Sequence, residues 1–241
     1  QSIMAKLKIV STGSHGNSFL LICERETLLI ELGVSWDNIL RSLDYNLDNV
    51  VGCLVSHRHK DHSISIPNAL KFSLSVYSCK DVQSIYPQVK VLERGSKKRI
   101  GGFLIQPIPL YHDVECYGFL IEHKDFGRMV FATDTNTFPY RLKNINHILI
   151  EANYKDEYII DNLCMNEASR SASGNHLEIN ETIEAIKKNY TQELQNVVLI
   201  HLSHTNANSE EFKKDVESAI GMKCVTIGES DVEVELNSCE F

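Results

Sequence analysis

Short apolar runs rich in β-branched residues recur along the chain, and several are separated by longer stretches in which apolar residues recur at helical spacing. The short runs predict β-strands and the longer stretches predict α-helices. Strands are expected around residues 7–10, 18–23, 27–31, 51–55, 75–78, 103–108, 117–122, 128–133, 147–151, 197–201 and 231–236. Helices are expected near residues 36–43, 63–72, 178–189 and 209–219. This alternation predicts an α/β (α+β) fold in which helices cover sheets.

The chain has the length and composition of one layered domain. Its 241 residues, of which 43% are apolar, suffice for a sizeable core. We expect residues 4–241 to form a single domain, and we interpret residues 1–3, which precede Met4, as a remnant added ahead of the native start. The polar stretch 154–174 is the candidate for a flexible insertion, and we interpret it as a lid or a dimer contact.

Three histidines and a carboxylate lie within the segment Ser56-His-Arg-His-Lys-Asp-His62. A predicted strand precedes this segment and a helical stretch follows it, so a strand-to-helix loop is expected. His57 and His59 then point one way, while Asp61 and His62 turn toward a second point nearby. Zinc binds imidazole nitrogen and carboxylate oxygen. Solvated loop residues are the alternative, but this spacing favours a site for two metal ions.

The spacing His57-x-His59-x-Asp61-His62 resembles the signature of the metallo-β-lactamase fold hydrolases. The opening segment, residues 7–21, resembles the strand, glycine turn and second strand of the YycJ/WalJ branch, which is related to RNase Z-type phosphodiesterases. Members of this branch usually carry SGSxGNS, and here Thr12 replaces one serine. The resemblance implies a four-layer αββα sandwich with both metal ions at one edge of the two sheets.

The resemblance also implies the remaining metal ligands. His112, Asp134 and His201 each follow an apolar run and match the next ligands of the family in order. The implied ligand sets are His57, His59 and His112 for one ion, and Asp61, His62 and His201 for the other, with Asp134 as the bridge. Each later match alone is also compatible with a packed side chain, and His204 competes with His201. The two divalent ions are expected to be zinc or manganese.

The resemblance assigns three further roles. Asp61 is expected to orient or deprotonate the attacking water. His176 resembles a histidine that assists the leaving group in related phosphodiesterases. The alternative for His176 is a surface histidine ahead of a helix that Asn180 would cap. Glu31 stands where the family normally has an aspartate that supports the metal ligands.

Charge and cysteine content limit the partners. The formal net charge of −8 argues against broad attachment to nucleic-acid backbones, whereas a small anionic substrate or a strand end remains compatible. The basic clusters 97–99 and 187–188 are interpreted as solvated faces. No apolar run approaches the length of a membrane span, so no membrane partner is expected. Seven scattered cysteines favour reduced thiols and a cytoplasmic location. A homodimer is expected only from the prevalence of dimers.

The combined pattern predicts a metal-dependent phosphodiester hydrolase. The favoured hypothesis is a nuclease that acts on DNA, as the YycJ/WalJ resemblance implies. A cyclic-nucleotide phosphodiesterase of the phage anti-Pycsar type fits the acidic charge and compact length at least as well. Hydrolysis of a carbon ester, lactone or β-lactam is less favoured, because Asp61, His62 and His201 indicate two metals and phosphoester chemistry. The complete ligand set argues against a binding protein that has lost activity.

Overall fold

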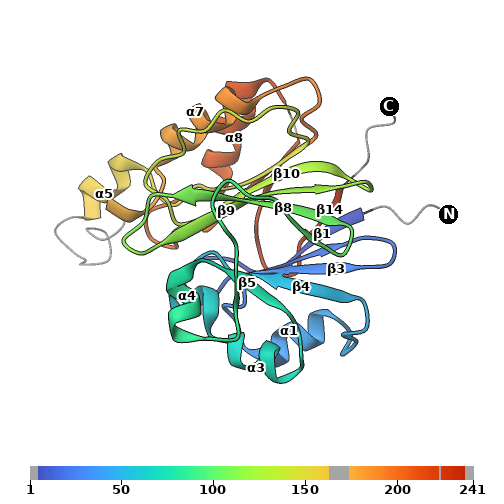
Figure 1. Ribbon diagram of the computed structural model, residues 1–241. Helices are drawn as coiled ribbons and strands as arrows, with labels where there is room; N and C mark the ends of the chain where they lie inside the picture. The colour runs from blue at the N-terminus through green and yellow to red at the C-terminus, as the bar shows by residue number, and fades with distance from the viewer. Residues whose placement is uncertain (1–4, 163–173, 223, 237–241) are drawn as a thin grey trace.

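The computed structural model describes residues 5–162, 174–222 and 224–236. Two seven-stranded sheets lie face to face between two layers of helices (Figure 1). The predicted four-layer αββα sandwich is therefore confirmed. The expectation for residues 1–3 falls outside the described residues, as does the part of the predicted insertion from 163 to 173.

The first sheet has the strand order β14-β1-β2-β3-β4-β5-β6. Its strands are β1 (Ala5–Ser11), β2 (Ser18–Ile22), β3 (Thr27–Ile30), β4 (Val50–Leu54), β5 (Val76–Ser78), β6 (Lys90–Val91) and β14 (Glu233–Leu236). Strands β3 to β6 pair in parallel, and the other pairs are antiparallel. The outer face is covered by α1 (Trp36–Ser42), α3 (Ile66–Lys71) and α4 (Lys80–Ile85) (Figure 1).

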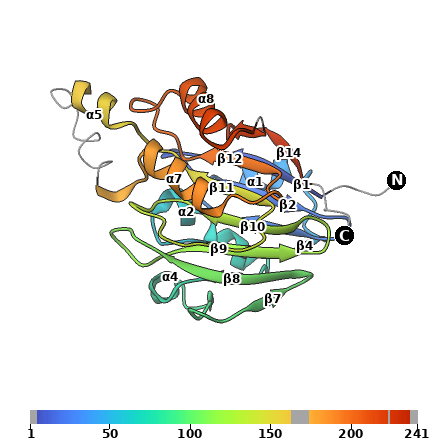
Figure 2. The same cartoon turned by 90° about the horizontal axis from the view of Figure 1, so that it is seen from above.

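The second sheet has the strand order β13-β12-β11-β10-β9-β8-β7, and β8, β9 and β10 lie side by side in Figure 2. Its strands are β7 (Lys98–Ile100), β8 (Phe103–Leu110), β9 (Cys116–His123), β10 (Gly127–Ala132), β11 (His147–Glu151), β12 (Asn196–Ile200) and β13 (Val225–Ile227). Strands β10 to β13 pair in parallel. Two helices, α7 (Ile179–Asn189) and α8 (Ser209–Ile220), cover its outer face (Figure 1).

Apolar side chains fill the space between the layers. Phe19 of β2 packs edge-on against Phe131 of β10 with ring centroids 5.4 Å apart, and both are fully buried. Outside the second sheet, Ile186 of α7 and Phe212 of α8 are also fully buried in one apolar cluster. Burying a large apolar side chain contributes about 1.5–3 kcal/mol. These contacts fix the two sheets relative to each other, and with them the loops at the sheet edges.

The structure corrects two details of the predicted elements. The stretch 63–72 is not one helix: α2 (Lys60–Ser63) ends before α3 begins. Pro67 lacks an N–H and is accommodated in the first turn of α3, where no intrahelical partner is needed. Glu178, rather than Asn180, caps α7, because its carboxylate accepts from the Asn180 N–H at 2.5 Å.

Several short elements were not predicted. They are α4, β6, β7, β13 and α5 (Asp156–Asn162), and each has too few residues for a clear hydrophobic period. Helix α5 occupies the described beginning of the predicted insertion. Among the helices that the structure describes, none combines the length and apolar character needed to cross a membrane.

Candidate metal centre

The predicted ligands come from loops at one edge of the sandwich. The segment with three histidines and Asp61 follows β4 and passes into α2, as predicted. In the second sheet, His112 follows β8, Asp134 follows β10 and His201 follows β12. Parallel strands of one sheet end at the same edge, which is where α/β proteins commonly bind ligands. Both sheets therefore contribute side chains to one site.

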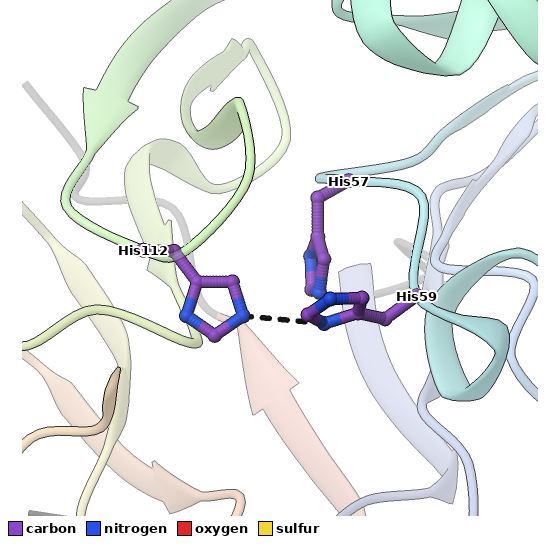
Figure 3. Close-up of side chains that lie close together, drawn as sticks. All are labelled: His57, His59 and His112. Atoms are coloured by element: carbon purple, nitrogen blue, oxygen red, sulfur yellow. Dashed lines mark hydrogen bonds between the residues drawn. The ribbon is translucent and has the colours of Figure 1, made fainter. Parts of the chain in front are cut away.

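The first predicted ligand set, His57, His59 and His112, converges on one point. Figure 3 shows the three rings close together, with His112 on a loop separate from the other two. One ligand-capable nitrogen from each ring lies within 4.8 Å of the others. His112 Nε2 is 3.3 Å from His59 Nδ1, and His57 is fully buried. This spacing suits three imidazoles around one ion.

The second predicted set, Asp61, His62 and His201, also converges. Asp61 Oδ2 lies 3.3 Å from His62 Nε2 and 3.9 Å from His201 Nε2. Asp134 stands between the sets: its Oδ2 is 3.1 Å from His62 Nε2, and it also groups with His57. A carboxylate placed in this way has an oxygen to offer to each set.

Two nitrogens of this cluster have no hydrogen-bond partner within the described part of the chain. They are Nε2 of His57 and Nε2 of His201, and both are buried. Because buried polar atoms are nearly always paired, orphaned nitrogens among histidines and carboxylates fit bound cations. The donor set of imidazole nitrogen and carboxylate oxygen suits zinc or manganese.

Hydrogen bonds hold the opposite nitrogens of the rings. Ser56 Oγ lies 2.8 Å from His57 Nδ1, and the Asn175 carbonyl oxygen lies 3.1 Å from His112 Nδ1. A partner on one ring nitrogen orients the ring so that the other nitrogen can face an ion. Asn175 thus helps to orient His112 through its backbone carbonyl group. Its side chain gave no reason to predict it as a site residue.

Glu31, which replaces the usual aspartate, is fully buried and reaches the cluster from the end of β3. Its Oε1 accepts from the Ser56 N–H at 3.2 Å, and its Oε2 is 3.4 Å from His62 Nδ1. Glu31, Asp134 and His201 have positive φ values of 65°, 51° and 55°. Such backbone conformations cost roughly 1–3 kcal/mol each and persist only where the surroundings hold them. Three strained backbone positions therefore lie at this edge.

The glycine-rich opening segment supports the histidine loop. The Asn17 side chain donates to the carbonyl oxygens of Gly13 at 3.1 Å and of Asp61 at 3.3 Å. Gly33 permits the close approach, because a Cβ at this position would lie 1.6 Å from the Asp61 carbonyl oxygen. The segment that carried the resemblance therefore contacts the backbone of a predicted ligand.

His176 lies beside the two ligand sets. Its ring stacks on that of His201 with centroids 5.2 Å apart, and its Nδ1 is 2.6 Å from Glu151 Oε1. The fully buried Glu151, the last residue of β11, was not predicted as a site residue. Its Oε1 also lies 3.1 Å from His201 Nδ1. The sequence feature that could have identified Glu151 as a site residue is a carboxylate at the end of an apolar run that predicts a buried strand.

The carboxylates and histidines shift one another's protonation. Burial lowers the pKa of His201, but Asp134, Asp61 and Glu151 outweigh it and raise that pKa to about 10. Burial likewise opposes ionisation of Asp134, yet the surrounding histidines hold its pKa well below the usual range. For His176, the Glu151 carboxylate outweighs burial and raises the pKa. Ionised carboxylates at a buried edge attract cations.

His204, the competing candidate for the last ligand, lies apart from the cluster. Its side chain is exposed, and its ring is 5.3 Å from the exposed His15. His201, by contrast, is 3% exposed and belongs to the second ligand set. The geometry therefore supports the choice of His201.

Two facing sheets covered by helices, with histidines and carboxylates gathered at one edge, give this chain the metallo-β-lactamase fold. Among curated proteins, the chain is 26% identical over 223 residues to exodeoxyribonuclease WalJ of Streptococcus pneumoniae, covering 83% of this chain and 82% of that protein. It is 22% identical over 241 residues to exodeoxyribonuclease YycJ of Bacillus anthracis, covering 92% of this chain and 91% of the relative. No family model matches the chain.

Solved structures agree on the fold. The metallo-β-lactamase fold protein YhfI from Bacillus subtilis superposes with a TM-score of 0.76 at 17% identity, covering 96% of this chain and 99% of that one. The short form of human tRNase Z gives a TM-score of 0.66 at 12% identity, covering 96% and 99%. The resemblance stated from the sequence is thus confirmed, and the roles of individual residues stay predictions.

Proposed function

We propose that this protein is a phosphodiesterase that binds two divalent metal ions and cleaves DNA. The observation that carries the two-ion proposal is the pair of ligand sets that meet at Asp134. Support for the substrate comes from the WalJ and YycJ relatives, both named exodeoxyribonucleases, which the chain matches over most of their length.

The catalytic steps divide between the ions and the chain. When bound, the ions lower the pKa of water and stabilise charge on the attacking and leaving oxygens. Asp61, whose side chain is 29% exposed, accepts a hydrogen bond from the attacking water and orients it. The protonated form of His176 donates the proton on Nε2 to the leaving oxygen, while Glu151 accepts a hydrogen bond from Nδ1–H and favours this form.

The distribution of basic residues supports contact with a short stretch of nucleic acid. Arg58 and Lys60 alternate with the proposed ligands in the histidine loop, and both are exposed. The predicted basic cluster 97–99 lies away from this loop. Strand β7, with Lys98 and Arg99, pairs with the beginning of β8, whose far end leads to His112. With a net charge of −8, few phosphate contacts are available, which fits a strand end.

A matched pair of histidine variants tests the two-ion centre. His201→Ala removes a proposed ligand, and His204→Ala removes an exposed histidine nearby. Turnover of bis(p-nitrophenyl) phosphate would be measured with manganese or zinc, together with metal content by mass spectrometry. We expect His201→Ala to lose turnover and part of its bound metal, and His204→Ala to keep both. Full activity of His201→Ala would refute the ligand assignment.

The substrate is tested on the wild-type protein. Linear single-stranded DNA, 3′,5′-cyclic mononucleotides and a lactone would be assayed side by side, with Asp61→Ala as the blank. Cleavage of DNA supports the proposal. Turnover of cyclic nucleotides alone would make the protein a cyclic-nucleotide phosphodiesterase, and turnover of a lactone without any phosphoester would refute both.

A cytoplasmic location and a homodimer remain parts of this proposal. The described cysteines, Cys23, Cys53, Cys79, Cys116 and Cys224, are free thiols, as expected in a reducing compartment. A role of residues 154–174 as a lid or dimer contact likewise stays a prediction.

A further inference from the structure

A second group of side chains of the types that bind metal ions lies at the opposite edge of the sandwich. Cys23 stands in the turn between β2 and β3, and the far end of β3 leads to Glu31. His123 closes β9 and pairs with Gly127, the first residue of β10, whose far end leads to Asp134. This group therefore joins one turn from each sheet, a strand length away from the candidate metal centre.

Three different ligand atoms meet there. Cys23 Sγ, His123 Nδ1 and a carboxylate oxygen of Asp125 all lie within 4.8 Å of one another. The Sγ to Nδ1 distance is 3.3 Å, and Nδ1 is 3.7 Å from Asp125 Oδ2. Around a tetrahedral zinc ion, neighbouring nitrogen, oxygen and sulfur ligands lie about 3.3–3.6 Å apart. The observed distances need adjustments of only a few tenths of an ångström.

The opposite nitrogen of His123 is already held by a carboxylate. His123 Nε2 donates to Glu26 Oε1 at 3.1 Å, and Glu26 Oε2 accepts from the Gly102 N–H at 2.7 Å. A Cβ at Gly102 would lie 2.3 Å from Glu26 Oε1, so glycine makes room for this pair. Carboxylates that accept from one nitrogen orient metal-binding histidines in this way.

The remaining nitrogen of His123 carries a lone pair. Because Nε2 donates to Glu26, the neutral ring has no proton on Nδ1, and the Asp125 N–H donates to it at 3.1 Å. A bound ion would take the place of that N–H. The Asp125 side chain is 20% exposed, which opens the group to solvent, whereas Cys23 and His123 are each 5% exposed.

We propose that Cys23, His123 and Asp125 bind a zinc ion that links the β2–β3 turn to the β9–β10 turn. Thiolate, imidazole and carboxylate are all established zinc ligands, and water completes the four-coordinate site. The ion takes no part in hydrolysis and instead fastens the two sheets to each other. The inference is independent of the function proposed above.

The local charge supports cation binding. The carboxylates of Asp125 and Glu26 place negative charge close to the Cys23 side chain. The same negative charges attract a divalent ion. Binding breaks the S–H bond, releases the proton to water and forms the zinc–thiolate bond. Lys124 is 3.9 Å from Asp125, but its side chain is 80% exposed and free to move away.

Cobalt(II) provides the test, because a thiolate bound to cobalt gives a charge-transfer absorption in the near ultraviolet. The full chain would be stripped of metal with a chelator and titrated with cobalt(II). We expect this absorption in the wild-type protein, its loss in Cys23→Ser and its bleaching by added zinc. Asp125→Asn, at a partly exposed position, provides a second variant. Because it removes a direct ligand, it should weaken cobalt binding by more than the roughly 10–100-fold that loss of an outer-shell partner causes.

Two further cysteines serve as controls. Cys53→Ser alters a fully buried thiol in the core, and Cys116→Ser alters the thiol 3.7 Å from His57 Nδ1. The absorption should persist in both. Its absence from wild type, or its persistence in Cys23→Ser, would overturn the proposal and leave a hydrogen-bonded thiol and histidine. Turnover of bis(p-nitrophenyl) phosphate should be the same in Cys23→Ser as in the wild-type protein. A failure of the zinc proposal is therefore distinguishable from a failure of the hydrolase proposal, in which the wild-type protein itself would show no turnover.

Discussion

The histidines differ in what holds each ring, and these partners decide what each ring can do. His57 and His201 each keep a buried Nε2 without a hydrogen bond among the described residues, which suits metal binding. Both nitrogens of His147 are hydrogen-bonded, which suits a structural role. His176 lies against the buried carboxylate of Glu151, which suits proton transfer.

The proton-donor role of His176 predicts a dependence on the leaving group. His176→Ala should slow DNA cleavage about 10²–10⁴-fold, the usual contribution of general acid catalysis. Bis(p-nitrophenyl) phosphate should lose much less activity, because p-nitrophenolate departs without a proton. Steady-state kinetics on both substrates, with metal content measured in parallel, checks the prediction. Equal losses on both substrates would contradict it, and His204→Ala serves as the control.

Local spacing predicted the histidine loop, but the contact between Glu151 and His176 was not predicted. His57, His59 and His62 lie within one short segment, so the conformation of a single loop brings them together. Glu151 and His176 belong to β11 and to the loop before α7. Their contact depends on how that loop folds back over the sheet. Nothing in the sequence spacing of these two residues encodes that path.

At the scale of elements, both sheets repeat one pattern of strand pairing. An antiparallel pair, β2–β3 or β9–β10, is followed by three parallel pairs. The sequence predicted most of these strands, because strands buried on both faces form continuous apolar runs. It could not predict their order, since pairing joins residues far apart in the chain. Strand β6, with two residues, is too short to leave a pattern.

His147 ties neighbouring elements together and predicts a pH-dependent stability. Its Nε2 donates to the Phe126 carbonyl oxygen before β10, and its Nδ1 accepts from the Asn196 side chain at the start of β12. Burial lowers its pKa to about 4, against an ordinary value of 6.5. Between these values the unfolded chain binds a proton that the folded chain does not. Stability therefore falls as the pH decreases from 6.5 to 4, by up to about 3 kcal/mol from this residue.

Urea unfolding at several pH values, in the presence of a chelator, checks this slope. His147→Gln should be less stable at neutral pH and should lose part of the decline between pH 6.5 and 4. The exposed His204→Gln should follow the wild-type curve. If His147→Gln keeps the full wild-type slope, His147 is not the group responsible.

At the scale of the whole molecule, the candidate centre exists only when both halves of the sandwich are assembled. The histidine loop follows β4 of the first sheet, whereas His112, Asp134 and His201 follow strands of the second. The family resemblance placed these residues at one edge, and hydrophobic periodicity alone did not. Packing between the sheets, such as Phe19 on Phe131, is what sets the distance between the two contributions.

Metal binding should therefore stabilise the assembled sandwich. An ion that binds the folded chain and not the unfolded one adds about 2.7 kcal/mol at a hundredfold excess over its dissociation constant. We expect a chelator to lower the urea midpoint of the wild-type protein. Cys23→Ser lacks the proposed zinc site between the two turns, so the effect of the chelator on this variant reports on the candidate metal centre. Most of the shift in the urea midpoint should remain in this variant. In His201→Ala combined with Cys23→Ser the shift should shrink further, because the second ligand set is then incomplete. A midpoint that is unaffected by chelation in Cys23→Ser would show that the histidine edge does not couple metal binding to folding.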